Sequence, residues 1–330
     1  MRILLIKTGA LGDVLRTTAL IPPLRHAYGE KICWLTSKAA KPLLEGNPAI
    51  NKIFTDPQKI HQKFDWVLSL EENRRLAFLA QKLSLKKITG VVCQGKRLSY
   101  TPDSSPYYQM SLLNPDKKKA DALKSKNQKT FLELWLSLLG LPRFKKSALA
   151  QPQIFLKESD RKTALSFAQE HNLPNSLIGF NPGAGSRWPS KELSVQKSRE
   201  ILKKLAALKK PILLLGGHEE KARNQKIARS LPHVFLTPVL PLKPFAALID
   251  LCQLVITTDS LAFHIATALK KKVLVLIGPT SSSELDVFGK GERIAVPFCS
   301  CFYRPSCLRR KSCLNSLSPS LIISAVLRNL

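Results

Sequence analysis

Apolar runs and helical patterns alternate along the first half of the chain. Ile3 to Ile6 and Trp66 to Leu70 are short continuous apolar runs, typical of strands that are buried on both faces. Val14 to Leu24 and Arg74 to Leu83 have the spacing of amphipathic helices. Such alternation predicts an open parallel sheet with helices between its strands. Further strands are expected over 32–35 and 53–54, and a short helix over 39–44.

The second half repeats this pattern. Strands are expected over 177–180, 211–215, 254–257 and 273–277, and helices over 160–171, 195–208, 222–230 and 260–269. The stretch between the two patterns, 96–127, carries three prolines and a lysine run and is predicted to be a long surface segment with short helices. A helix over 130–139 and a linker over 142–152 follow.

A length of 330 residues exceeds what one hydrophobic core usually needs. We therefore expect two consecutive α/β domains of the parallel-sheet, Rossmann-like kind. The first covers residues 1–150 and the second residues 151–315, with a final helical segment over 316–330.

The charge is strongly basic, with a formal net value of +29. Residues 1–150 carry 26 basic against 11 acidic side chains, and residues 151–330 carry 26 against 12, so the excess is not a tail. Such a surface attracts nucleic acid, anionic lipid or phosphorylated substrates, unless the charges are merely solvated. Aromatic residues make up only 7% of the chain, which argues against a nucleic-acid-binding protein.

Nothing in the sequence predicts secretion or membrane insertion. The first apolar run is only four residues long and ends at Lys7, too short for a signal peptide, and no apolar run reaches the length of a membrane span. We expect a cytoplasmic protein, which its charge allows to touch a membrane surface. The seven cysteines are then expected to be reduced.

The first candidate site is the loop from Thr8 to Asp13, directly after the first predicted strand. Ligands bind beyond the carboxyl ends of parallel strands, and glycines such as Gly9 and Gly12 let the backbone approach them closely. Asp13 is either a helix N-cap or a carboxylate base that takes a proton from an attacking hydroxyl. Lys7, Thr8, Gly9 and Gly12 are candidates for contact with the acceptor or a phosphate.

The second candidate is the loop from Asn181 to Lys191. It lacks both the Walker ending and the third glycine of the dinucleotide fingerprint. It does place small residues, hydroxyls and cations after a strand, as diphosphate binding requires, although a surface turn would have the same composition. The candidates here are Asn181, Gly183, Ala184, Gly185, Ser186 and Lys191.

A third group follows two later strands. Asp259 is expected to cap the helix over 260–269, and His264 lies on its polar face, where it is either solvated or in contact with a ribose or phosphate. A Gly-Gly-His-Glu-Glu stretch at 216–220 ends another strand. The candidates are Thr258, Asp259, Ser260, His264, Gly278, Pro279 and Thr280.

Four cysteines, Cys299, Cys301, Cys307 and Cys313, crowd near the C-terminus. Four thiolates suffice for a zinc ion, but the spacing is not that of a zinc ribbon, and Cys299 and Cys301 are close for two tetrahedral ligands. Reduced or buried thiols are favoured, and no metal site is predicted.

Taken together, these motifs resemble glycosyltransferase family 9, the ADP-heptose–lipopolysaccharide heptosyltransferases. The resemblance runs from Lys7 to Asp13 and Val14 to Thr18, through Asn47 to Ile50 and Asn181 to Lys191, to the terminal cysteines. It implies a GT-B fold, with two Rossmann-like domains facing a central cleft, and an inverting reaction that does not depend on a bound metal.

By position, the resemblance makes Asp13 the base and Lys191 the lysine that binds the donor diphosphate, and places Asp259, Ser260 and His264 in the donor-binding segment. It implies an ADP-sugar as the donor, no bound cofactor, and an anionic glycolipid acceptor such as a lipopolysaccharide core. It also implies that the final helix packs back on the first domain. We expect a monomer.

The sequence departs from the family after Lys191, where Glu192-Leu193-Ser194 replaces the usual tryptophan. This difference bears on the sugar and the acceptor more than on the reaction type. The alternatives are another sugar-nucleotide enzyme of similar fold, such as an epimerase, and a basic nucleic-acid-binding protein.

Overall fold

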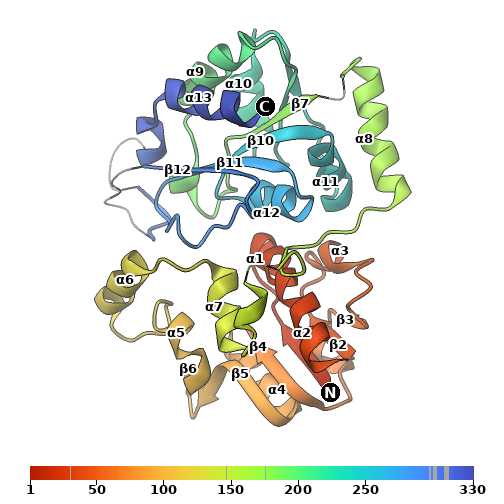
Figure 1. Cartoon of the computed structure of the whole chain (residues 1–330), viewed down its shortest axis with the longest axis vertical. Coiled ribbons are helices and arrows are strands. Elements are labelled where there is room, and N and C mark those ends of the chain that lie inside the picture. Colours follow the sequence, from red (N-terminus) through yellow and green to blue (C-terminus); the bar gives the residue numbers. More distant parts are fainter. Residues whose placement is uncertain (30, 146, 175, 297–298, 300–302, 308–311) are drawn as a thin grey trace. The chain divides into compact units, whose positions relative to one another are not determined.

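The computed structural model describes residues 1–330 except 30, 146, 175, 297–298, 300–302 and 308–311. The chain divides into two compact units (Figure 1). Unit one comprises Met1–Phe155 with Ser283–Asp286, and unit two comprises Leu156–Ser282 with Val287–Leu330.

Unit one is built on a sheet with the strand order β3-β2-β1-β4-β5-β6. All of its pairs are parallel except the last, in which β6 runs antiparallel to β5. Its strands are β1 (Arg2–Ile6), β2 (Lys31–Leu35), β3 (Lys52–Phe54), β4 (Phe64–Ser69), β5 (Ser84–Gln94) and β6 (Arg97–Tyr100).

The helices of unit one are α1 (Leu11–Thr17), α2 (Ile21–Tyr28), α3 (Lys41–Leu44), α4 (Arg74–Leu83), α5 (Ser105–Tyr108), α6 (Lys117–Lys126) and α7 (Phe131–Leu138). Short 3-10 turns are η1 (Thr18–Leu20), η2 (Pro57–Lys59), η3 (Pro102–Ser104) and η4 (Pro142–Phe144). Helix α7 begins with a capping box between Thr130 and Glu133, which satisfies backbone donors of its first turn.

Unit two repeats the arrangement, with the strand order β12-β11-β10-β7-β8-β9 and parallel pairing between these strands. Its strands are β7 (Leu177–Asn181), β8 (Ile212–Leu214), β9 (Val234–Leu236), β10 (Cys252–Thr258), β11 (Lys272–Ile277) and β12 (Gly291–Ala295). Its helices are α8 (Glu158–Glu170), α9 (Val195–Ala206), α10 (Lys221–Ala228), α11 (Leu242–Asp250), α12 (Leu261–Ala268) and α13 (Pro319–Asn329), with 3-10 turns η5 (Pro189–Lys191) and η6 (Cys313–Ser316).

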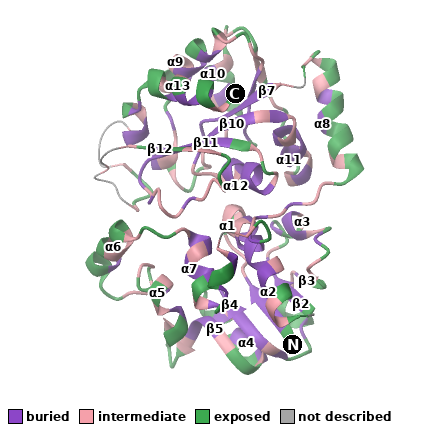
Figure 2. Ribbon diagram, viewed as in Figure 1, coloured by how far each residue is buried: buried purple, intermediate pink, exposed green. Residues whose placement is uncertain are grey.

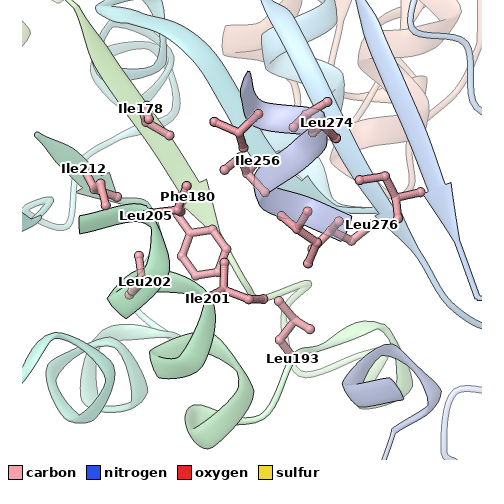
Figure 3. Close-up of a cluster of buried hydrophobic side chains, with 14 of the residues drawn as sticks. Ile178, Phe180, Leu193, Ile201, Leu202, Leu205, Ile212, Ile256, Leu274 and Leu276 are labelled. Atoms are coloured by element: carbon pink, nitrogen blue, oxygen red, sulfur yellow. The ribbon is translucent and has the colours of Figure 1, made fainter. Parts of the chain in front are cut away.

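The core of unit two follows from the two-residue repeat of its strands. Ile178 and Phe180 on β7 point to the same side as alternate residues of β8, β10 and β11, and they pack against α9 (Figure 3). Helices α9, α10 and α13 group together, while α8, α11 and α12 form a second group (Figure 1). Buried residues therefore fill the strands, and exposure is concentrated on outer helix faces such as those of α6 and α8 (Figure 2).

The predicted parallel sheets are confirmed, and several elements were missed. Strand β6 falls in the stretch expected to be irregular, and β9, β12 and α11 were not anticipated. Three-residue β9 is only partly buried and carries little periodicity. Strand β6 lacks a buried residue and is ordered by its ladder with β5, a contact that local sequence does not specify.

The final helix, α13, packs within unit two. Its residues Ile322, Ala325 and Val326 form an i, i+3, i+4 stripe that is buried in the core with α9 and the sheet. Arg328 pairs with Glu292 on β12 at 2.7 Å. This apolar stripe is therefore used within unit two. Packing of the helix on the first domain stays a prediction.

Substituting Phe180→Ala should lower the free energy of unfolding by about 3–5 kcal/mol, because the side chain is fully buried at the centre of this core. Urea denaturation followed by circular dichroism measures the change. Leu165→Ala on α8, where the side chain is 48% exposed, is the control and should change the value by less than about 1 kcal/mol. Equal losses in both variants would contradict this account of the core.

Candidate functional site

In unit two, the candidate residues gather at the carboxyl ends of three neighbouring strands, β7, β10 and β11. The loop after β7 is held from behind: Asn181 Oδ1 accepts from the Gly183 amide at 3.0 Å, and Thr258 Oγ1 donates to the Gly183 carbonyl at 2.8 Å. Gly185 has a φ of +74°, a left-handed conformation that favours glycine. The second and third groups of candidate residues therefore lie at one edge of the same sheet.

The centre of this cluster is an ion pair. Lys191 Nζ lies 2.6 Å from Asp259 Oδ2, and Thr280 Oγ1 donates to the same oxygen at 3.0 Å. Both side chains of the pair are largely buried, with 17% and 12% of their surface exposed. Three loops far apart in sequence therefore meet at one carboxylate, which fixes the lysine ammonium at the mouth of the sheet.

Electrostatics keep Asp259 ionised. Burial alone would raise the pKa of its carboxyl, but the ammonium of Lys191 and the charge on His264, together with hydrogen bonds from Lys191 and Thr280, bring the pKa below its usual range. The net result is a largely buried lysine ammonium held beside an ionised carboxylate.

At helix α12, the N-cap alternative for Asp259 and the solvated alternative for His264 are both wrong. The N-cap of α12 is Ser260, so Asp259 does not cap the helix, and its side chain pairs with Lys191 instead. His264 is buried rather than solvated, because α12 packs on all sides and carries buried residues throughout. Ser260 Oγ lies 3.0 Å from Thr257 Oγ1, at the end of β10.

Carboxylates occupy the amide donors of the loop after β7. The Gly185 amide donates to Glu220 at 3.1 Å and the Ser186 amide to Glu219 at 2.7 Å. The Ala184 amide donates to Glu192 at 3.4 Å. Glu219 and Glu220 follow β8 and Glu192 follows Lys191, but the sequence did not predict that these glutamates bind the loop. The loop thus has anion-binding geometry, satisfied here by the chain's own side chains.

The Gly278-Pro279-Thr280 turn is built into the same edge. A side chain at Gly278 would come within 3.0 Å of Leu314 and 3.3 Å of Cys313 Sγ, so the backbone packs closely on η6. The Pro279 carbonyl accepts from the Tyr303 amide at 2.7 Å. These contacts aim Thr280 at Asp259.

In unit one, the loop after β1 is organised by Glu71, which sequence reasoning missed. Glu71 Oε2 accepts from the amides of Thr8 and Gly9, both at 2.7 Å, and lies 3.5 Å from Lys7 Nζ. Burial opposes ionisation, but Lys7 and these hydrogen bonds bring the pKa of Glu71 below its usual range. Glu71 comes just after β4, the strand that pairs with β1. Its position at the carboxyl end of a predicted strand was the sequence feature that could have identified it.

This geometry changes the reading of Lys7, Thr8 and Gly9. Their donors hold a carboxylate of their own unit, and a side chain at Gly9 would lie 3.1 Å from Glu71 Oε1. The arrangement indicates a loop that is fixed in place. It does not favour a loop whose amides are free to bind a phosphate.

Asp13 lies in the first turn of α1, together with Gly12. The N-cap of this helix is Ala10, which has a φ of 43°, so the N-cap alternative for Asp13 is wrong. Asp13 Oδ1 lies 2.9 Å from Arg16 Nη2, and a third of the Asp13 side chain is exposed. The Arg16 guanidinium in turn stacks over the Phe131 ring at 4.1 Å. Asp13 is therefore a solvent-accessible carboxylate. Its orientation is fixed by Arg16, which is itself held against Phe131.

The terminal cysteines are only partly covered, since Cys301 lies outside the described residues. Cys299 Sγ and Cys313 Sγ are 3.3 Å apart. Among the described residues, no three His, Cys, Asp or Glu side chains group in a way that would hold a metal ion.

Comparisons with known proteins agree with this architecture. The family model of glycosyltransferase family 9 (heptosyltransferase) matches residues 57–296, a range that contains the unit-two cluster and begins after the Asp13 loop. The lipopolysaccharide heptosyltransferase 2 of Salmonella typhimurium (strain LT2) is 24% identical over 307 residues, covering 85% of this chain and 84% of the relative.

Solved structures give the same fold. Glycosyl transferase family 9 from Veillonella parvula DSM 2008 superposes with a TM-score of 0.78 at 20% identity, covering 99% of this chain and 96% of that one. E. coli heptosyltransferase WaaC with ADP gives 0.61 at 16% identity, covering 100% and 98%. The fold is that of the GT-B glycosyltransferases. The chain belongs to glycosyltransferase family 9, the heptosyltransferase family, as its motifs indicated.

The Lys191–Asp259 pair gives a test by pH. In the wild type, the lowered pKa of Asp259 contributes stability above its ordinary value of 3.8, and this is lost as the pH falls through the lowered pKa. Lys191→Met leaves a buried carboxylate without its cation, which should cost about 3–5 kcal/mol at neutral pH. The deficit should disappear in acid, where Asp259 is protonated in both proteins.

Denaturant unfolding of the wild type and Lys191→Met, from neutral pH down through the lowered pKa of Asp259, measures this deficit. Lys203→Met, which removes an exposed lysine of α9, is the control and should cause little loss at any pH. A deficit for Lys191→Met that does not depend on pH would show that Asp259 is not the partner that matters.

Proposed function

We propose that this chain transfers a heptose, or a related sugar, from an ADP-sugar to the saccharide of an anionic glycolipid such as a lipopolysaccharide core, with inversion at the anomeric carbon. The observation that carries the proposal is the fixed Lys191 ammonium at the carboxyl ends of β7, β10 and β11, in a family member whose relative WaaC is described with ADP. The relatives' names supply the sugar and the acceptor.

The proposed reaction is a single displacement. The acceptor hydroxyl gives its proton to the Asp13 carboxylate while its oxygen forms a bond to the anomeric carbon. The bond from that carbon to the diphosphate oxygen breaks at the same time, and ADP leaves with the electron pair. One displacement inverts the configuration at that carbon.

Charge on the leaving group is the main demand of this reaction. Lys191 supplies a positive charge for the diphosphate, and the amides of Gly185 and Ser186 offer donors once Glu220 and Glu219 move aside. We therefore propose a reaction that does not depend on a bound metal. Full turnover in the presence of a chelator is expected; loss of turnover that a metal restores would refute this part.

The protein is also proposed to act as a cytoplasmic monomer at the inner face of the membrane. No described helix has both the length and the apolar character needed to cross a bilayer. The acceptor would then be reached from the membrane surface, to which the net charge of +29 attracts the protein.

Asp13→Asn should lower turnover by about 100-fold or more, because an amide does not take up the acceptor proton. Binding of ADP, measured by calorimetry, should be unchanged, because the donor residues are in unit two. Glu170→Gln on α8, an exposed carboxylate changed in the same way, should keep wild-type turnover. If Asp13→Asn turns over normally, Asp13 is not the base; if UDP binds and ADP does not, the donor is wrong.

Glu71→Ala should lower turnover by about 10–100-fold, because the amides of Thr8 and Gly9 lose the acceptor that holds the loop before Asp13. The fall should be in kcat rather than in the affinity for ADP. Glu71→Gln keeps one acceptor oxygen and should recover part of the activity. If Gln and Ala at position 71 behave alike, the hydrogen bonds to Glu71 do not position the loop.

A further inference from the structure

A hollow of about 740 Å³ lies between the first half of α4 and the turn that joins β5 to β6. On the helix side it is lined by Asn73, Arg74, Arg75 and Phe78, and on the strand side by Cys93 and Gly95. None of these residues belongs to the site described above. The exposed side of α4, in unit one, is shown in Figure 2.

The walls of the hollow are rigidly joined. The Gln81 side chain bonds to the Cys93 backbone in both directions, donating to its carbonyl at 3.2 Å and accepting from its amide at 2.8 Å. Asn73 Oδ1 accepts from the amides of Arg75 and Leu76 and caps the helix. The hollow is therefore a fixed feature of the fold and not the gap beside a loose loop.

The charged residues that line the hollow, Arg74 and Arg75, are both positive. Residues 73–100 include seven lysines and arginines and no acidic residue. Lys86 pairs with Asp65 at 3.7 Å and Lys87 lies over the Trp66 ring. Within the described part of the chain, Arg74 and Arg75 make no ion pair. Their charges are thus available to an external anion.

An apolar ring accompanies these charges. Phe78, one turn after Arg74 and Arg75 on α4, lines the hollow and is 67% exposed. A phenylalanine side chain with so much of its surface exposed is unfavourable in water. Burial of this side chain at the boundary between lipid headgroups and acyl chains would stabilise the membrane-bound state. Cations flanking an exposed aromatic residue are the pattern of a surface that lies in a lipid interface.

We propose that this surface, formed by Arg74, Arg75, Phe78 and the rim of the β5–β6 turn, docks unit one on an anionic lipid bilayer. Headgroup phosphates pair with the two arginines, and the Phe78 ring enters the boundary between headgroups and acyl chains. The inference extends the proposed function by assigning its membrane surface to one face of the fold, but its test does not require sugar transfer.

Co-sedimentation with phosphatidylcholine vesicles, with and without phosphatidylglycerol, tests the proposal on the full chain. The wild type should bind only the vesicles that contain phosphatidylglycerol. The double variant Arg74→Gln/Arg75→Gln should bind these at least about 10-fold more weakly, since each interfacial cation contributes roughly a fivefold effect. Phe78→Ser should weaken binding about 10-fold without changing the charge.

Two matched controls separate a local surface from general attraction. Lys117→Gln/Lys118→Gln on α6 removes the same charge from an exposed helix of the same unit, and Leu112→Ser removes an apolar side chain that is 85% exposed. Both should bind vesicles like the wild type. An unchanged circular dichroism spectrum and an unchanged denaturant midpoint in every variant show that the fold is intact.

The proposal is overturned if the α6 control loses as much binding as the arginine variant, since attraction would then be a property of the net charge alone. It is also overturned if Phe78→Ser binds normally, or if inorganic phosphate or duplex DNA binds these residues in preference to vesicles. If the vesicle results hold while no sugar transfer is found, the docking surface stands and the proposed reaction fails.

Discussion

Burial of both faces of each parallel sheet is the constraint on which the rest of this protein depends. Ile178 and Phe180 on β7, and their counterparts on β8, β10 and β11, fill the middle of these strands with apolar side chains. The polar residues that contact the site, such as Asn181 on β7 and Thr258 on β10, are the last residues of their strands or lie in the loops that follow. Because neighbouring parallel strands end at the same edge, loops separated by many residues meet there, and Lys191, Asp259 and Thr280 form one cluster.

Both units hold their glycine loops with carboxylates from an adjacent strand end. Glu71 accepts from the Thr8 and Gly9 amides in unit one, and Glu219 and Glu220 accept from Ser186 and Gly185 in unit two. The supporting carboxylates of the two loops differ in their burial. Glu71 is largely buried and ion-paired with Lys7, which suits a permanent support. Glu219 is at the surface, so moving it away from the Ser186 amide, as the proposed nucleotide binding requires, uncovers less buried charge.

Only the folded structure shows where the basic residues of the chain lie. A net charge of +29 spread evenly over both halves does not distinguish a substrate site from a docking surface. The fold separates them: Lys191 is paired at the mouth of the unit-two sheet, whereas Arg74 and Arg75 flank an exposed ring on the outside of α4. The two sites for which we propose anion recognition, one for a nucleotide and one for a membrane surface, therefore lie in different units.

The sequence by itself determined the periodic elements, the two α/β units, the family and most of the candidate site. Apolar runs and glycine loops are local signals, and the order in which they recur specifies a parallel sheet. Tertiary structure decided the rest. The partner of Asp259, the role of Glu71, the burial of His264 and the packing of α13 all depend on contacts between distant segments. An aspartate before a helix looks like a cap until a lysine 68 residues away is brought to it, because burial and pairing are properties of the folded chain and not of its local pattern.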